Sequence, residues 1–460
     1  MIMLGELAMI DFDDPKRKEY VNDVIAKIQE QNIKFAHLQF IDINGLLKSF
    51  SVSTKFIENS LTDGQYFDGS SITGMGRMEE SDMVAIPDPS TFAIIPWLSK
   101  DLSTCRFICD IFTPARKPYN GDPRFILKKA VEAAKKEGFI FKCAPELEFF
   151  VLEENESVVP TPMDFSGYFD LHPSGVSEDI RRKMADAAES FGIDIEVAHH
   201  EVAVGQNEID FRYDEAMITA DRAVTMKMII KSIAKQNGFL ATFMPKPFYG
   251  VNGSGMHVHQ SLWNLKGDNM FFAPDNEKSG YLSDIALYYI GGQLAHGREM
   301  SAILASWPNS YKRLVPGYEA PVYIAWAHKN RSPLIRVPDF GKRKNAARIE
   351  IRCPDPAGNP YLQFAVLLHA GLDGIKKKIM PPEPTELNVY KLTYEERRSR
   401  GIVSLPESLS DALRELEGSE LMRSALLGAY NNFLDAKWKE WDEFRTQVSS
   451  WELERYLQKL

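Results

Sequence analysis

The 460-residue sequence predicts a globular protein of mixed α-helices and β-strands, built from about two or three domains. Two strand-like segments flank an Asn-Gly turn near the N-terminus, and apolar residues recur at helical spacing farther along the chain. A cluster of Pro, Asn and Gly at 114–123 separates these two regions and predicts a domain boundary.

The N-terminal region is expected to hold a hairpin. Residues 35–43 and 47–52 alternate between apolar and polar side chains, and Asn44-Gly45 between them is a strong local signal for a hairpin. A helix is predicted before it, over 20–31, and the first ~20 residues are expected to form a leader or a short helix.

Helices dominate the rest of the chain. Apolar spacing and glycine stops predict helices over 123–138, 177–192 and 219–238, followed by a helical C-terminus from Ser408. Four aromatic residues near the end are expected to be core or subunit-contact residues rather than a cofactor site; they are Trp438, Trp441, Phe444 and Trp451.

Composition excludes several classes of protein. With 54 Lys+Arg against 64 Asp+Glu, the net charge of −10 provides no broad positive field for nucleic acid. No run of ~18 apolar residues predicts a membrane span, and the N-terminus lacks the pattern of a signal peptide. Four cysteines are too few for a disulfide framework, so we expect packed thiols and a cytoplasmic protein.

Four short segments carry unusual polar residues on one face of a predicted strand. Alternation places Glu146 with Glu148, His257 with His259, and Arg348 with Glu350 and Arg352; in the fourth segment it groups Glu208, Asp210 and Arg212. Each segment alone is more often the solvated face of an amphipathic strand. Together with Glu201, the four segments favour a site for Mg²⁺ or Mn²⁺, because neighbouring carboxylates repel one another without a cation.

Arginines concentrate between residues 313 and 352, at Arg313, Arg331, Arg336, Arg348 and Arg352. Guanidinium groups beside acidic metal ligands are the apparatus of phosphoryl transfer. No Walker motif or Gly-rich dinucleotide fingerprint occurs, so a nucleotide would be held in another way. The stretch NGSG at 252–255 either lets backbone approach a ligand or forms a plain turn.

The chain resembles glutamine synthetases of the bacterial and archaeal type I class. The resemblance runs in order across nearly the whole chain, in FDGSS (67–71), ESDM (80–83), PELEFF (145–150), HHEVAVGQNEIDF (199–211), MPKPFYGVNGSGMHVHQSL (244–262), NSYKRLVPGYEAPVY (309–323), NRSPLIR (330–336) and RIEIRCPDPAGNPY (348–361).

The resemblance implies an α+β fold and an assembly. We expect an N-terminal extension (1–17), a β-grasp domain (18–116) and a catalytic domain (117–460) whose curved antiparallel sheet is flanked by helices. Twelve subunits would form two stacked hexameric rings with active sites between subunits, and the helix at 451–460 would link the rings.

The resemblance also assigns roles to residues. Two or more divalent ions would be held by Glu148, Glu201 and Glu208, and by Glu146, His257 and Glu350. Glutamate or its phosphorylated intermediate would contact Asn252, Gly253, Arg313, Glu319, Arg331 and Arg352. ATP would contact Glu196, Phe211, Tyr213, His259, Ser261, Arg331 and Arg336.

The implied reaction is the ATP-dependent ligation of ammonia to glutamate, through γ-glutamyl phosphate. Asp68 from a neighbouring subunit would bind ammonium and take its proton, and Arg331 would neutralise charge on the phosphate. A loop at 316–320 bearing Glu319 would close over the intermediate, because an acyl phosphate hydrolyses in open water.

Regulation is expected to be of the kind without adenylylation. The segment NVYKLT keeps Tyr390 but departs from the modified pattern NLYDLP. Arg77 is either a feedback residue for glutamine or an ordinary surface residue; 2-oxoglutarate and small regulatory proteins are other expected partners. A γ-glutamyl ligase acting on a larger amine, and a non-catalytic ring, are the alternative functions.

Overall fold

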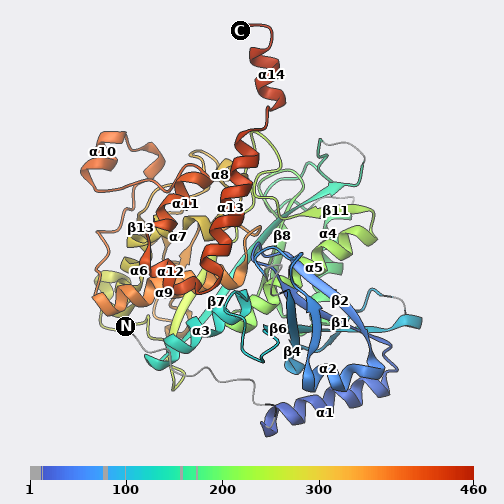
Figure 1. The fold of residues 1–460 in the computed structure, drawn as a ribbon. Helices are drawn as coiled ribbons and strands as arrows, with labels where there is room; N and C mark the ends of the chain where they lie inside the picture. Colours follow the sequence, from blue (N-terminus) through green and yellow to red (C-terminus); the bar gives the residue numbers. More distant parts are fainter. Residues whose placement is uncertain (1–11, 13, 76–80, 99, 156–158, 172–174) are drawn as a thin grey trace.

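The computed structural model describes residue 12 and residues 14–75, 81–98, 100–155, 159–171 and 175–460. Arg77 and most of the expected extension 1–17 lie outside the described residues. In Figure 1 the N-terminal sheet and its helices (blue) lie beside a larger body of helices and strands.

The N-terminal region forms a six-stranded sheet in the order β2-β1-β6-β4-β3, with β5 paired to β6. The β1–β6 pair is parallel and the other pairs are antiparallel. Its elements are α1 (Pro15–Glu30), β1 (Phe35–Ile41), β2 (Leu47–Ser53), η1 (Thr54–Phe56), α2 (Ile57–Asp63), β3 (Gln65–Asp68), β4 (Asp82–Pro87), η3 (Pro89–Thr91), β5 (Ala93–Ile94), η4 (Lys100–Leu102) and β6 (Thr104–Phe112).

The predicted hairpin is confirmed. Strands β1 and β2 pair antiparallel from Ile41 opposite Leu47 outward, and Asn44-Gly45 lies in the turn. Gly45 has φ +81°, and a Cβ there would lie 2.9 Å from the Cα of Asn359. Only glycine fits this turn, because the turn combines positive φ with close approach of backbone from the larger region.

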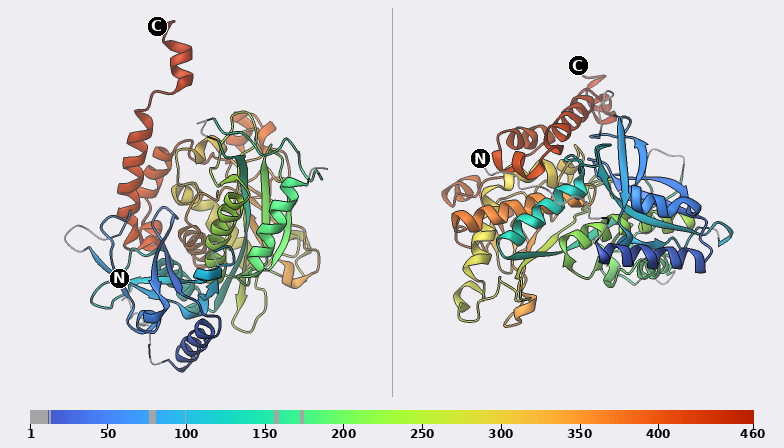
Figure 2. Two further views of the ribbon diagram at one scale, coloured as in Figure 1. Left: turned by 90° about the vertical axis from the view of Figure 1, so that its right-hand side faces the viewer. Right: turned by 60° about the horizontal axis from the view of Figure 1, so that its bottom comes forward.

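The larger region is organised by a curled sheet (Figure 2). Its strands lie in the order β13-β14-β15-β12-β7-β9-β8, and β10 and β11 also pair with β7. The predicted antiparallel arrangement holds for every pair except β13–β14, which is parallel, so the sheet is mixed. Its strands are β7 (Phe139–Glu153), β8 (Ile195–His200), β9 (Gln206–Phe211), β10 (Asp214–Glu215), β11 (Phe239–Thr242), β12 (Val258–Asn264), β13 (Trp326–Ala327), β14 (Ile335–Arg336) and β15 (Ile349–Ile351).

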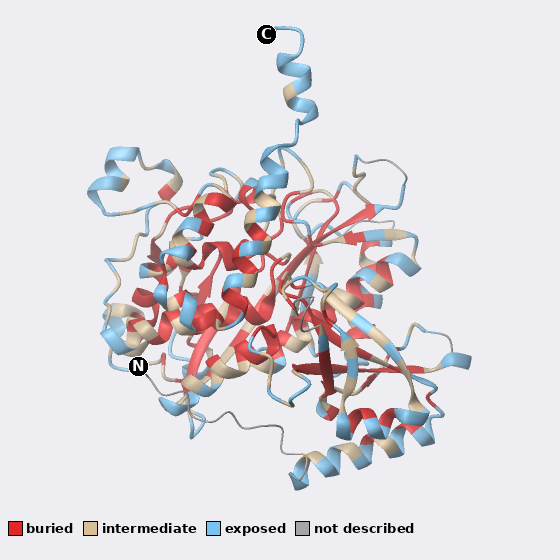
Figure 3. Ribbon diagram, viewed as in Figure 1, coloured by how far each residue is buried: buried red, intermediate tan, exposed pale blue. Residues whose placement is uncertain are grey.

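Helices cover this sheet, and α9 is buried along most of its length (Figure 3). The three central helices predicted from sequence are present as α3 (Pro123–Lys136), α4 (Val176–Glu189) and α5 (Ala216–Gln236). The others are η5 (Glu277–Ser279), α6 (Asp284–Ala295), α7 (Gly297–Leu304), α8 (Ser310–Arg313), η6 (Lys344–Ala346), α9 (Pro360–Lys377), η7 (Val389–Lys391), α10 (Tyr394–Ser399), α11 (Leu409–Glu417), α12 (Glu420–Leu426), α13 (Ala429–Arg445) and α14 (Ser450–Tyr456).

The C-terminal helices extend away from the body, and α14 projects farthest (Figure 1). Trp438 and Trp441 pack against the main core, as expected of core residues. Phe444 and Trp451 are exposed, Trp451 by 55%. A short helix that leaves a large aromatic side chain in solvent is typical of a segment that contacts another subunit.

A buried ion-pair cluster joins the two regions. The guanidinium of Arg124 in α3 donates to Asp88 (2.9 Å) and Asp110 (2.6 Å) of the N-terminal region and to Asp221 of α5 (2.8 Å). Although burial acts to raise it, Arg124 lowers the pKa of the Asp110 carboxyl. Arg124 therefore fixes the orientation of the N-terminal sheet against helices α3 and α5 of the larger region.

All four cysteines are free and buried, as expected of packed thiols. Within the described residues, no helix combines the length and the apolar character needed to cross a membrane.

Candidate active site

The candidate site lies where β7, β9, β12 and β15 run side by side. The register places Glu148 opposite Glu208, and His259 opposite Glu350. The N–H of Glu146 donates to the carbonyl of His257 (2.9 Å). Facing residues of paired strands share one face of a sheet, so the four segments found by alternation converge on one surface.

A cavity of about 270 Å³ opens over this face and contains most of the predicted metal and substrate residues. Its lining includes Glu146, Glu148, Glu201, Glu208, Asn252, Gly253, His257, Arg313, Glu319, Arg331, Arg336, Glu350 and Arg352. We call this the first cavity. Residues from 146 to 352 along the chain thus meet in one place.

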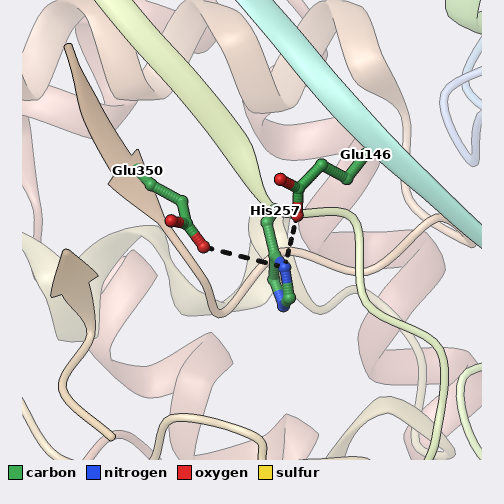
Figure 4. A group of neighbouring side chains, drawn as sticks. All are labelled: Glu146, His257 and Glu350. Carbon is green, nitrogen blue, oxygen red and sulfur yellow. Dashed lines mark hydrogen bonds and ion pairs between the residues drawn. The ribbon is translucent and has the colours of Figure 1, made fainter. Parts of the chain in front are cut away.

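One group of possible metal ligands is formed by Glu146, His257 and Glu350 (Figure 4). His257 Nδ1 lies 2.8 Å from Glu146 Oε2 and 3.8 Å from Glu350 Oε1. These are the three residues that the resemblance assigned to one ion. Two carboxylates and one imidazole, with no thiolate, are suited to Mg²⁺ or Mn²⁺.

A second group is formed by His199, Glu208 and Asp210. His199 Nε2 lies 3.1 Å from Glu208 Oε1. Burial and neighbouring carboxylates raise the pKa of both acids to about 9. Among the described residues, Asp210 Oδ1 is buried without a hydrogen-bond partner. A divalent cation would satisfy this oxygen and relieve the repulsion.

Glu148 and Glu201, expected beside Glu208, line the same cavity but do not join that second group in the described part of the chain. Glu148 Oε2 accepts hydrogen bonds from Gln206 Nε2 and from the N–H of Gly255, both at 2.9 Å. Burial is the largest cause that raises the pKa of the Glu148 carboxyl, and the negative charges of Glu208 and Glu201 raise it further. Crowded, desolvated carboxylates of this kind fit a site that receives positive charge.

Arginines neutralise one side of the cavity. Both oxygens of Glu350 are paired, with Arg336 Nη1 at 2.8 Å and Arg352 Nη1 at 2.5 Å. Although burial acts to raise it, Arg352 and His259 lower the pKa of the Glu350 carboxyl. Arg331 also lines the cavity, so cationic and acidic groups face the same space.

The NGSG stretch lies at this cavity rather than in a distant turn. Asn252 Nδ2 donates to Glu319 Oε2 (3.2 Å). A Cβ at Gly253 would lie 2.2 Å from the carbonyl oxygen of Pro245 and 3.2 Å from the side chain of Arg313. Glycine is therefore required at 253, and its backbone forms part of the cavity wall.

A second cavity of about 570 Å³ adjoins the first, and Glu146 lines both. It contains five of the predicted ATP residues: Glu196, Phe211, Tyr213, His259 and Ser261. Arg331 and Arg336, the other two, line the first cavity. His259 Nε2 lies 2.7 Å from Glu146 Oε1, so this imidazole reaches the boundary between the cavities.

Asp68 is the one predicted catalytic residue that lines neither cavity. It ends β3 in the N-terminal sheet, and it is exposed.

Several lining residues were missed from the sequence. Tyr168 lies beside Arg331 in a loop with no periodic pattern, so nothing local marked it. Gln206 and Tyr318 are single polar residues of types common on any surface. Lys142 lines the second cavity, and its ammonium nitrogen lies 4.5 Å from the ring centroid of Trp263. It was missed because the strand that contains it was selected only for its glutamates.

Comparison with known proteins explains this geometry. The family model described as "Glutamine synthetase, catalytic domain" matches residues 120–456, and "Glutamine synthetase, beta-Grasp domain" matches 32–114. The chain belongs to the glutamine synthetase family. Membership assigns it the family's activity, the ATP-dependent ligation of ammonia to glutamate with use of a divalent metal.

Similar glutamine synthetases cover nearly the whole chain. The protein from Methanosarcina mazei is 48% identical over 441 residues, which is 95% of this chain and 98% of the relative. That from Thermotoga maritima is 50% identical over 434 residues, 94% and 98% of the two chains. A solved structure titled "GmaS/ADP complex-Conformation 1" has a TM-score of 0.86 and 31% identity, covering 95% of this chain and 99% of its own.

Proposed function

We propose that this glutamine synthetase works through γ-glutamyl phosphate, with ATP in the second cavity and glutamate in the first. The observation that carries the proposal is that Glu146 lines both cavities. The γ-phosphoryl group needs to pass between a nucleotide and an amino acid held side by side, and the shared wall supports such an arrangement.

The ATP site is proposed to consist of Glu196, Phe211, Tyr213, His259 and Ser261, with Arg331 and Arg336 reaching the phosphates. The rings of Tyr213 and Trp263 are stacked with their centroids 6.5 Å apart, which supports an aromatic wall for the adenine base. Glutamate would contact Asn252, Gly253, Arg313, Glu319, Arg331 and Arg352. A guanidinium group pairs well with a carboxylate, which suits arginines to this substrate.

The ions would be held by Glu146, His257 and Glu350, and by Glu148, Glu201 and Glu208. His199 and Asp210 lie close enough to Glu208 to support one of the sites. The ligand set favours Mg²⁺ or Mn²⁺, and such ions, when bound, offset negative charge on the transferring phosphoryl group. Two separate ligand groups support at least two ions in each site.

The chemistry of the chain's residues follows from these positions. A γ-carboxylate oxygen of glutamate attacks the γ-phosphorus of ATP and ADP leaves, while Arg331 neutralises charge on the phosphoryl group. Ammonium gives a proton to Asp68, ammonia attacks the γ-carbonyl carbon, and phosphate departs with the second proton that the new amide nitrogen loses. Glu319 covers the intermediate, and its contact with Asn252 supports a closed loop.

The position of Asp68 supports a site shared between subunits. It is exposed in its own subunit and lines neither cavity, so its proposed role would be in a neighbouring subunit's site. We propose a homododecamer of two hexameric rings, with the exposed α14 in contact between rings. The expected domains are 18–116 and 117–460, and the four buried free thiols support a cytoplasmic location.

Regulation is proposed to use small effectors, glutamine or 2-oxoglutarate, and small regulatory proteins. Arg77 remains the candidate residue for feedback.

Steady-state assays of phosphate release test the proposed function. With glutamate and ATP present, ammonium is compared with a panel of amines that includes methylamine and polyamines. The proposal expects ammonium to give the highest kcat/KM and equal amounts of phosphate and glutamine. Preference for a larger amine would replace it with a γ-glutamyl ligase of different specificity.

A further inference from the structure

The loop over the first cavity, residues 316–321, is held by very little backbone structure. Before it, the N–H of Val315 donates to the carbonyl of Arg313 (2.8 Å), and after it the carbonyl of Val322 accepts from the N–H of Leu405 (2.8 Å). Between these points, no backbone–backbone hydrogen bond joins the loop to any described residue. Its conformation therefore depends on side-chain contacts.

Among the described residues, three hydrogen-bond or cation–π contacts from side chains reach the loop. The hydroxyl of Tyr390 donates to the carbonyl oxygen of Ala320 (2.6 Å). Asn252 contacts the side chain of Glu319, and the ammonium of Lys246 lies 3.9 Å from the ring centroid of Tyr318. Of these, only the Tyr390 contact is a hydrogen bond to the loop's backbone within the described chain.

Tyr390 is itself firmly placed. It lies in η7, where the N–H of the buried Val389 donates to Ser332 Oγ (3.1 Å). The ring of Tyr390 packs against that of Tyr323, with the two ring centroids 6.2 Å apart. Burial raises the pKa of Tyr390 to about 12, so the hydroxyl stays protonated and donates throughout the neutral range.

The hydrogen bond from Tyr390 is made directly after Glu319, whose backbone is in an unfavourable conformation. Glu319 has φ +58°, in the left-handed region that a glutamate rarely adopts. Such a conformation persists only when surrounding contacts hold it. The Ala320 carbonyl comes directly after Glu319, so a hydrogen bond to it fixes the peptide that follows the Glu319 backbone.

We propose that Tyr390 is a positioning residue, whose hydrogen bond to the Ala320 carbonyl holds the Glu319 loop closed over the first cavity. The inference rests on the proposed role of this loop in shielding γ-glutamyl phosphate. With the loop open, a water oxygen attacks the γ-carbonyl carbon, phosphate leaves, and glutamate is regenerated. ATP is then consumed without formation of glutamine.

The test compares Tyr390→Phe with the wild-type enzyme at saturating ammonium. Phenylalanine keeps the ring and its packing and removes only the hydroxyl. Tyr394→Phe is the matched control, because Tyr394 carries the same group on the exposed surface of α10. Two quantities are measured: the ratio of phosphate released to glutamine formed, and the rate of cleavage after Glu319 by a Glu-specific protease without ligands, mapped by mass spectrometry.

In Tyr390→Phe the cleavage after Glu319 should be about two- to ten-fold faster, the range expected when one hydrogen bond no longer holds the loop closed. The ratio of phosphate to glutamine should rise above one, while KM for ATP and the melting temperature stay at wild-type values. Tyr394→Phe should match wild type in every readout. A ratio of one, or an unchanged cleavage rate, in Tyr390→Phe overturns the inference. Wild-type enzyme that releases phosphate without glutamine would instead overturn the proposed function.

Discussion

Gly253→Ala is expected to disable glutamate binding while leaving the fold intact. The new Cβ would lie 2.2 Å from the carbonyl oxygen of Pro245, which already accepts a hydrogen bond from the N–H of Ser254 (2.8 Å). Because ordinary contacts begin above 3 Å, the loop needs to move by about 1 Å. A displacement of that size at a substrate site costs on the order of 100-fold in rate, or ~2.7 kcal/mol.

The assay is steady-state synthesis of glutamine with glutamate varied. Gly253→Ala should lower kcat/KM for glutamate about 100-fold and keep its melting temperature within a few degrees of wild type. Gly418→Ala is the matched control, because its Cβ would lie 3.6 Å from the nearest atom, an ordinary contact. Wild-type kcat/KM in Gly253→Ala would refute the claim that this backbone forms the substrate wall.

Three further predictions concern the ion pairs and the metal. Arg124→Met should lower the free energy of unfolding by about 3–5 kcal/mol in denaturant titrations, whereas exposed Arg182→Met should cost no more than about 1 kcal/mol. Arg124 keeps the pKa of the Asp88 and Asp110 carboxyls low, although burial acts to raise it. These ion pairs therefore stabilise the fold above pH ~4, and the loss of stability caused by Arg124→Met should shrink as the pH falls further. A loss that stays constant with pH would contradict this. Glu350→Ala should abolish synthesis in an assembly of wild-type size, and wild-type rate would refute its assignment as a metal ligand. Chelation should abolish activity and lower the melting temperature, both restored by Mg²⁺ or Mn²⁺; activity that survives complete chelation would oppose the metal requirement.

Local signals were sufficient for much of the fold. Asn44-Gly45 identified its hairpin because the turn needs a residue with positive φ, and Gly45 adopts φ +81°. The helix at 123 was found because Phe125, Ile126 and Ala130, which the structure buries, recur at helical spacing and Gly138 follows the last turn. The helix expected from residue 219 begins at Ala216, since no capping side chain marks its start.

The part of the candidate site that lies on β-strands was predictable from the alternation of side chains along each strand. Glu146, His257 and Glu350 were selected from period-two patterns, and the structure gathers their ligand atoms into one group. Alternation says which face a side chain occupies but not which strands are neighbours. The pairing that brings His199, rather than Glu201, to Glu208 depends on the register of the β8–β9 hairpin, which alternation within each strand does not specify.

The crystallographic position of Mn²⁺ tests the central claim most directly. Anomalous diffraction from crystals of the wild-type enzyme grown with Mn²⁺ and a nucleotide should show one peak bounded by Glu146, His257 and Glu350, and a second beside Glu208. Peaks confined to other surfaces, with these side chains unliganded, would contradict the account.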